Sequence, residues 1–285
     1  IWSRKLRYRM HLRYLHNISM RWKGLQTMTL YEAIFRRKSV RKYKDTEIDS
    51  QLLEKIEQYG EDAVGIRPEI RTKWKILKGS DKRLAGLFLV KAPYYVVLYS
   101  EICEDYRKNA GCLMEQLALY LHTKGIGSCY QGGARVKHDE EKELEPVMIM
   151  AFGYPAEPLE RDREAFKRME LNRFVKVHGN FGKVQRKLLE AARVAPSAMN
   201  LQPWRFVVTD GRIHMFVKKP GKIGYQMQQD FNLFDAGIAL AHMLVTAEEQ
   251  WFDLEYQKLD SILEKDFPNN MYVGSLLILN ESEKI

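Results

Sequence analysis

Cysteine is scarce in this sequence: its 285 residues include only Cys103, Cys112 and Cys129, and no two of them form a CxxC pair. Their spacing fits no metal-binding pattern, and the seven histidines are scattered without an HExxH motif, so we expect no metal site. Because a sparse, odd set of cysteines is typical of a reducing compartment, we predict a cytoplasmic protein in which they have ordinary packing roles.

Long hydrophobic runs are also lacking. No stretch approaches the roughly 18 uninterrupted apolar residues of a membrane-spanning helix, and the longest apolar clusters, such as 148–152, have the length of a strand. Hydrophobic residues make up 45% of the chain and aromatic residues 11%, which predicts a folded, soluble protein without a membrane partner. The length allows one large domain or two of ordinary size.

Acidic residues are missing from the first 28 positions, which contain seven of the 46 basic residues. The formal net charge of +9 is concentrated there, because the remaining 39 basic residues nearly balance the 37 acidic ones. A nucleic-acid-binding module would gather lysine and arginine on a folded face among exposed aromatics, and no such stripe follows residue 44. We therefore expect no nucleic-acid partner; the alternative, a basic-tailed nucleic-acid binder, rests on residues 1–28 alone.

This basic leader, residues 1–28, is expected to lie outside the folded domain. Its apolar residues have helical spacing, and they are Leu6, Met10, Tyr14, Ile18 and Trp22. An Arg-rich amphipathic start without acids is similar to an organellar transit peptide. Our preferred interpretation is a disordered or non-native appended stretch, because a natural domain start follows Met28.

An internal repeat runs through the rest of the chain. Three anchors recur in the same order: 52–54 (LLE) as 188–190, Trp74 to Leu77 as Trp204 to Val207, and Ala110-Gly111 as Ala236-Gly237. Their offset falls from 136 to 130 to 126, as deletions in loops would cause. This period is far longer than the roughly 20–50 residues of solenoid repeats, so it predicts a duplicated domain with halves at 29–175 and 176–285. The alternative is a chance similarity between short sequence motifs.

Periodicity predicts an α+β fold with long helices at its core. We expect helices over 29–35, 49–59, 105–124, 184–195 and 236–247. We expect strands over 74–77, 93–99, 148–152 and 273–279, and a hairpin that joins 204–209 to 212–217 through Asp210-Gly211. Asp49 or Ser50 would cap the second helix and Gly60 would close it, whereas the apolar helix 236–247 must be buried.

A basic segment, residues 36–43 (RRKSVRKY), stands near the start of the first half. On an extended chain Arg37, Ser39 and Arg41 share one face, because side chains alternate with a period of two. Their guanidinium groups and hydroxyl can bind a phosphate or another anion. A solvated basic loop is the alternative.

A loop at residues 196–203 (PSAMNLQP) follows the first helix of the second half and leads into Trp204. A helix end with a turn explains its two prolines but not the combination of Ser197, Asn200 and Gln202. The loop resembles the PSxxNxQPW element of the FMN-dependent nitroreductase family, in which it lies against the flavin ring, and the basic segment resembles another signature of that family.

Two further segments resemble the same family. The glycine-rich segment, residues 125–133, includes Gly132 and Gly133 and is similar to the one whose backbone approaches the flavin. Residues 151–157 (AFGYPAE) are similar to the family's GYPAE element, after which a basic pair often reaches the phosphate; Lys167 and Arg168 are the best candidates. The glycines do not form a dinucleotide fingerprint, because GxGxxG would require glycine where Tyr130 stands.

The resemblance implies an FMN site and the chemistry of an NAD(P)H-dependent flavin oxidoreductase. It assigns the phosphate or the N1–O2 edge of the ring to the basic segment, including Lys38, and the ring to Pro196, Ser197, Asn200 and Gln202. NAD(P)H would donate a hydride to the flavin, and a nitroaromatic, a quinone or a similar small acceptor would then take the electrons. No catalytic side chain is required. A flavin-binding storage or sensing protein without turnover is the alternative.

Each half keeps only one of the two signatures. The first half has Ile66 to Ile70 in place of the 196–203 loop, and the second half has no basic segment before its first helix. This pattern resembles the family's single-chain pseudo-dimers, with two tandem half-copies around a helical core and one complete site per chain. A monomer can then be the active unit.

Overall fold

The computed structural model describes residues 28–86, 88–137, 141–162, 167–221, 224–259 and 267–280. The expectations for residues 1–27 lie outside these ranges. The chain divides into two compact units, one spanning Glu32–Lys167 and the other combining Arg168–Ile285 with the segment that ends at Tyr31. This division follows compactness, whereas the boundary predicted after residue 175 follows the repeat and stays a prediction.

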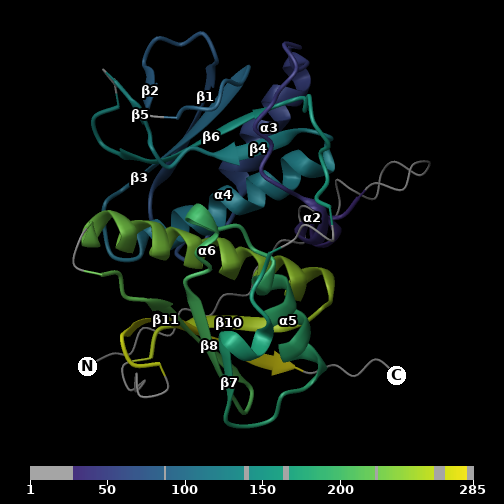
Figure 1. The fold of residues 1–285 in the computed structure, drawn as a ribbon, viewed down its shortest axis with the longest axis vertical. Coiled ribbons are helices and arrows are strands. Elements are labelled where there is room, and N and C mark those ends of the chain that lie inside the picture. The colour runs from purple at the N-terminus through teal and green to yellow at the C-terminus, as the bar shows by residue number, and fades with distance from the viewer. Residues whose placement is uncertain are drawn as a thin grey trace. The chain divides into compact units, whose positions relative to one another are not determined.

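The unit Glu32–Lys167 contains a four-stranded antiparallel sheet with the order β1-β3-β6-β4 (Figure 1). Strands β2 and β5 form a separate two-stranded antiparallel sheet. In chain order the elements are α2 (Leu30–Arg36), which begins just before this unit, α3 (Ser50–Asp62), β1 (Thr72–Lys78), β2 (Leu84–Gly86), β3 (Tyr94–Ser100), α4 (Tyr106–Thr123), β4 (Gly127–Tyr130), β5 (Ala134–Val136) and β6 (Glu145–Gly153). Every residue of β3 is buried, as its tyrosines and valines predict.

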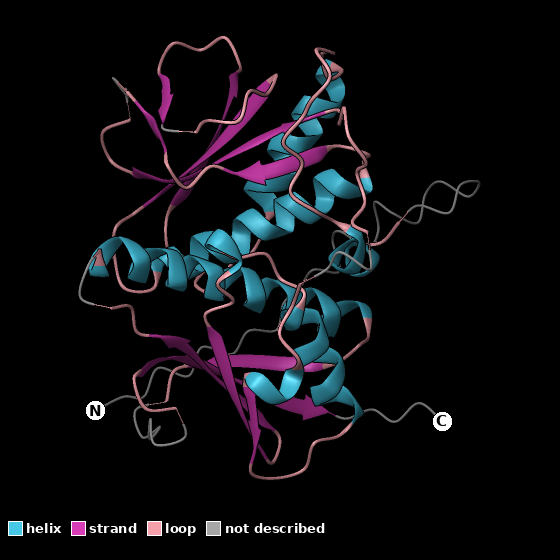
Figure 2. Ribbon diagram, viewed as in Figure 1, coloured by secondary structure: helices cyan, strands magenta, loops and turns pink. Residues whose placement is uncertain are grey.

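The other unit contains a five-stranded sheet, whose strands are magenta in Figure 2. Its order is β10-β11-β9-β8-β7, and among the described strands of this sheet β7 alone pairs in parallel with its neighbour. Its elements are η1 (Leu171–Arg173), β7 (Val175–Val177), α5 (Lys183–Arg193), η2 (Ala198–Asn200), β8 (Trp204–Thr209), β9 (Arg212–Lys218), α6 (Tyr225–Glu249), β10 (Asp253–Gln257) and β11 (Asn270–Asn280). The hairpin predicted at Asp210-Gly211 is confirmed, since Thr209 pairs with Arg212.

The two sheets repeat one topology. The order β1-β3-β6-β4 has the same pattern as β8-β9-β11-β10, each first strand follows a helix, α3 or α5, and a long helix, α4 or α6, separates the second strand from the third. The three sequence anchors fall on corresponding elements, and both Trp74 and Trp204 are buried. The sequence repeat is therefore also a repeat of structure, while the intramolecular pseudo-dimer stays a proposal.

Helix α3 confirms one end of the predicted helix and corrects the other. The Asp49 side chain caps it by accepting hydrogen bonds from the amides of Gln51 and Leu52, at 3.0 and 3.3 Å. Gly60 does not end the helix, which continues to Asp62. A Cβ at Gly60 would lie 3.0 Å from the Trp74 indole, so glycine permits close packing of the helix against β1.

Helix α6 is longer than expected, at 25 residues, and the predicted buried stretch 236–247 forms its second half. Apolar residues on all its faces fit the burial of this stretch. None of the described helices combines the length and the apolar character needed to cross a membrane.

Candidate functional site

Backbone hydrogen bonds hold the basic segment in an extended conformation against β4. Ser39 forms a parallel bridge with Ser128, and the Val40 amide donates to the Ser128 carbonyl at 3.0 Å. On the other side of the segment, the Ala156 amide donates to the Lys42 carbonyl at 2.9 Å. The three motif-like segments of the first half, 36–43, 125–133 and 151–157, are thus joined within one unit.

Glycine at position 127 permits this contact. A Cβ there would lie only 2.7 Å from the Cβ of Val40, closer than any side chain tolerates. Gly132 and Gly133, by contrast, lie in the exposed turn that follows β4. The glycine-rich segment therefore serves first to bring the basic segment against the strand.

Arg37 is buried, with only 2% of its surface exposed. Its Nη1 lies 3.7 Å from Oε1 of Glu115, a fully buried residue that also accepts a hydrogen bond from the Tyr130 hydroxyl at 2.6 Å. The Nε and Nη2 atoms of Arg37 have no hydrogen-bond partner among the residues that the structure describes. Two buried donors of a cation thus lack an acceptor.

Ser39, Arg41 and Arg37 all interact with the thiol of Cys129. Burial raises the pKa of the Cys129 thiol, while the charges of Arg41 and Arg37 and a hydrogen bond with Ser39 oppose that rise. Arg41 is exposed, as is Lys42, whereas Lys38 is partly buried. The Arg41 guanidinium also donates to the Ser39 carbonyl at 3.4 Å. The structure therefore brings the three residues predicted to share a face to one place, at different depths.

Arg36, Arg37 and Arg161 all act on one buried histidine. Burial first, and then the charges of Arg37, Arg36 and Arg161, lower the pKa of the buried His122 to about 4. Arg161 also donates through Nε to the Arg37 carbonyl at 2.8 Å. Such a neighbourhood suits an anion.

The 196–203 loop belongs to the other unit and has an unusual backbone. Met199, Asn200 and Gln202 have positive φ angles of 51, 57 and 48°. Such left-handed conformations cost about 1–3 kcal/mol each and persist only where neighbouring groups fix them. Within the loop, the Gln202 amide donates to the Ser197 hydroxyl oxygen at 2.9 Å, and Pro196 and Ser197 are partly buried.

Residues 168 and 169 hold the far end of the 196–203 loop. The Arg168 guanidinium donates to Oδ1 of Asn200 at 2.5 Å and to the Val194 carbonyl at 3.3 Å. The Met169 amide donates to Oε1 of Gln202 at 2.8 Å. The structure thus joins Arg168 to Asn200, two predicted site residues, whereas Lys167 is exposed in the other unit.

Asp235 of α6 contacts the same loop and was missed by sequence reasoning. It is 3% exposed, and both carboxyl oxygens lie within reach of the Ala198 amide, at 3.2 and 3.0 Å. Burial raises the pKa of Asp235 to about 8, against the lowering effect of this hydrogen bond. A single acid beside the Ala236-Gly237 anchor, at the start of a strongly apolar stretch, was the signal that could have found it.

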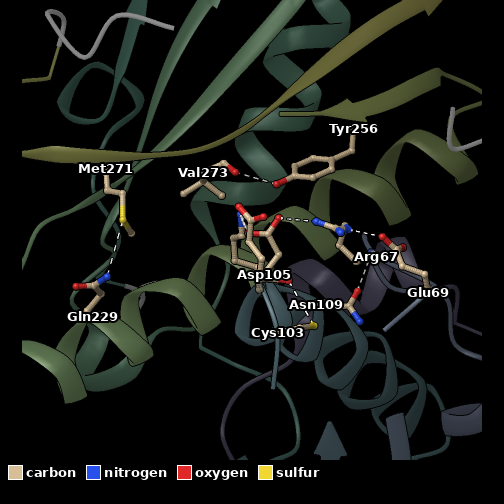
Figure 3. Close-up of polar contacts among 11 residues, drawn as sticks. Arg67, Glu69, Cys103, Asp105, Asn109, Gln229, Tyr256, Met271 and Val273 are labelled. Carbon is tan, nitrogen blue, oxygen red and sulfur yellow. Dashed lines mark hydrogen bonds and ion pairs between the residues drawn. The ribbon is translucent and has the colours of Figure 1, made fainter. Parts of the chain in front are cut away.

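The loop at 66–70, which stands at the corresponding place in the first half, is stabilised differently. Arg67 forms ion pairs with Glu69 at 2.6 Å and with Asp105 at 3.2 Å, and its backbone amide donates to Oδ1 of Asn109 at 2.8 Å (Figure 3). Asp105 also pairs with Lys108 at 2.8 Å. Charged side chains of the chain itself therefore satisfy one another here.

The described ranges contain no group of three or more His, Cys, Asp or Glu side chains that could hold a metal ion.

Comparison with known proteins matches residues 29–247 to the family described as "Putative TM nitroreductase". A Methanothermobacter thermautotrophicus protein named "Putative NADH dehydrogenase/NAD(P)H nitroreductase" is 25% identical over 151 residues, which cover 46% of this chain and 79% of that protein. The crystal structure of a Thermotoga maritima protein described as a "putative nitroreductase" matches with a TM-score of 0.62 and 23% identity, over 91% of this chain and 97% of that one.

A Clostridium difficile protein described as an FMN-dependent nitroreductase matches with a TM-score of 0.40 and 20% identity, over 53% of this chain and 98% of that one.

Proposed function

The chain belongs to the nitroreductase family, whose members are oxidoreductases, and we propose that it binds FMN, oxidises NAD(P)H and reduces a small acceptor such as a nitroaromatic or a quinone. The family and its fold agree with the expectations from sequence. The cofactor, the electron donor and the acceptor are the parts that we propose.

The buried guanidinium of Arg37 carries this proposal. A buried donor without an acceptor costs about 1–3 kcal/mol, and Arg37 has two such donors within the described part of the chain. A phosphate oxygen, or the N1–O2 edge of an isoalloxazine ring, would accept from them and gain a charge-assisted hydrogen bond. The donor set of Arg37, Ser39 and Arg41 fits an anionic cofactor.

The 196–203 loop supports the same proposal by its rigidity. Two of its left-handed residues accept hydrogen bonds through their side chains, Asn200 from Arg168 and Gln202 from Met169. The Ala198 amide, just before them, donates to Asp235. We assign contacts with the flavin ring to Pro196, Ser197, Asn200 and Gln202. A loop fixed in this way loses little conformational entropy when a planar ligand binds.

Further candidates are assigned by resemblance: Lys38, Lys167 and Arg168 to the phosphate, and the backbone of Gly132 and Gly133 to the flavin. For Arg168 the observed bond to Asn200 favours a role in holding the loop.

Bound FMN would supply the redox chemistry, since it accepts a hydride and passes electrons on. The protein's residues would bind and orient it and tune its electronic properties, without acting as acid or base. The name of the Methanothermobacter relative supports NADH or NADPH as the donor. We keep the cytoplasmic location as a prediction.

Absorbance spectroscopy of the purified protein, with FMN added, tests the proposal. We expect the bands of oxidised flavin to stay with the protein through gel filtration, to bleach with NADH or NADPH under anaerobic conditions, and to return when a quinone is added. Failure to retain added FMN would refute the proposal. Retained flavin that neither nicotinamide bleaches would instead favour a storage or sensing protein.

A further inference from the structure

One hydrogen bond occurs at corresponding places in the two halves. In the second half, Asp235 of α6 accepts from the Ala198 amide; in the first half, Asn109 of α4 accepts from the Arg67 amide (Figure 3). Asp235 and Asn109 are separated by 126 positions, the offset of the Ala-Gly anchor that follows each of them. The fold thus uses a side-chain acceptor on its long helix to hold the loop that follows α3 or α5.

The loops that these acceptors hold differ. The loop at 66–70 has ion pairs of its own through Arg67, and its residues are not among those with positive φ. The 196–203 loop has three left-handed residues, and the Ala198 amide lies immediately before the first of them. Loss of the acceptor therefore has different consequences in the two halves.

The Ala198 amide donates its hydrogen bond to Asp235. Asp235 is buried, and removing its side chain would leave the amide without this acceptor, at a site where an unmade hydrogen bond is costly. Release of that amide would allow the turn from Ser197 to Gln202 to relax toward ordinary backbone conformations. The far end of the loop would still be held by Arg168 and Met169.

We propose that Asp235 is a positioning residue for FMN. By accepting a hydrogen bond from the Ala198 amide, it keeps the 196–203 loop in the conformation, with three left-handed residues, that binds the cofactor. This inference rests on the proposed function. It assigns to Asp235 an action through the loop and no contact with the flavin. An amide side chain can replace it, since Asn109 makes the same bond in the first half.

Four variants separate this role from general stability. Asp235→Ala removes the acceptor, Asp235→Asn keeps it, and Asn109→Ala removes the matched acceptor in the first half. Should Asp235→Ala fail to fold, Asp235→Leu, which fills the space but cannot accept, takes its place. Two measurements apply to each: the dissociation constant of FMN by fluorescence titration, and hydrogen exchange of the 197–202 amides in the FMN-free protein.

We expect Asp235→Ala to weaken FMN binding on the order of 10-fold and to speed exchange in the loop. Asp235→Asn should stay within about 3-fold of the wild type in affinity, and Asn109→Ala should leave both FMN affinity and exchange in the 196–203 loop unchanged. Wild-type affinity and exchange in Asp235→Ala would overturn the inference, as would an equal loss of affinity in Asn109→Ala. If the wild type bound no FMN, the proposed function would fail, and the exchange data alone would still decide whether Asp235 positions the loop.

Discussion

The guanidinium of Arg168 donates a hydrogen bond to the side-chain oxygen of Asn200 at 2.5 Å. Sequence resemblance suggests Arg168 as a phosphate ligand, whereas this contact makes it a support of the loop proposed to lie against the flavin ring. The bond also fixes how the Asn200 amide is turned, because its oxygen faces Arg168. Asn200 is then oriented before any ligand arrives.

Replacing Arg168 with alanine should weaken FMN binding about 10-fold, because a hydrogen bond from a charged group contributes about 1.5–3 kcal/mol and part of it orients Asn200. Fluorescence titration with FMN measures the effect. Arg173→Ala removes an exposed arginine of η1 and is the matched control, expected to bind like the wild type. Equal affinities for the two variants would show that Arg168 does not support the loop.

Arg41→Ala should reduce FMN affinity on the order of 10–150-fold, the equivalent of about 1.5–3 kcal/mol. The stability of the FMN-free protein should barely change, because Arg41 is exposed and, among the described residues, its side chain makes only a long bond to the Ser39 carbonyl. Titration and urea unfolding test the two parts. Unchanged FMN affinity would mean that the basic segment is merely a solvated loop.

Arg37, unlike Arg41, should also contribute to the stability of the FMN-free protein. Arg37→Met should destabilise the FMN-free protein by about 3–5 kcal/mol, because it breaks a buried ion pair by removing the cation that lies beside Glu115. Adding Glu115→Gln should restore much of that loss, which urea unfolding of the single and double variants would reveal. If the double variant were no more stable than Arg37→Met, the pair would not be the reason for the loss.

The stability of the protein should depend on pH through the raised pKa of Asp235. Its pKa is raised to about 8 in the folded protein, whereas an unfolded aspartate titrates near 3.9. Asp235 therefore binds its proton more tightly in the folded state than in the unfolded state. The stabilisation that results is fully present below about pH 4, decreases as the pH rises, and is lost above about pH 8. Between these values the wild type should lose about 1.4 kcal/mol per pH unit relative to Asp235→Asn, as measured by urea unfolding from pH 5 to 9. A stability difference that did not change with pH would contradict the raised pKa.

The chain should bind one equivalent of FMN. Each half keeps one of the two signatures, and at the 66–70 loop Arg67 is already paired with Glu69 and Asp105. Flavin released by heat from saturated protein, compared with the chain concentration, measures the ratio. Two equivalents per chain would exclude a single site.

Local signals in the sequence predicted much of the fold. The cap at Asp49, the turn at Asp210-Gly211 and the apolar stripe of α4 act over a few residues, so they can be read from the chain alone. Strand β4 escaped notice because its residues, Gly127 to Tyr130, become a strand only by pairing with the distant β6. Gly60 was misread because the packing of Trp74 against it is a tertiary contact.

The sequence predicted which residues form the candidate site but not how deeply each side chain is buried. Alternation places Arg37 and Arg41 on the same face, yet Arg37 is buried beside Glu115 and Arg41 is exposed, a difference set by α4 and the segment after β6. The acid at the start of the apolar stretch could have drawn attention to Asp235, but nothing in its local sequence identifies Ala198 as the donor of its hydrogen bond.

The short strand β7 has a practical meaning for any attempt to separate the halves. Val175 to Val177 pair in parallel with Phe206 to Val208 along the outer edge of β8, so the link between the repeats forms part of the second half's sheet. A cut after residue 175 would divide that strand and expose the backbone of β8, an open edge to which another chain can add. A second half expressed alone should therefore begin before Leu171 if it is to resist aggregation.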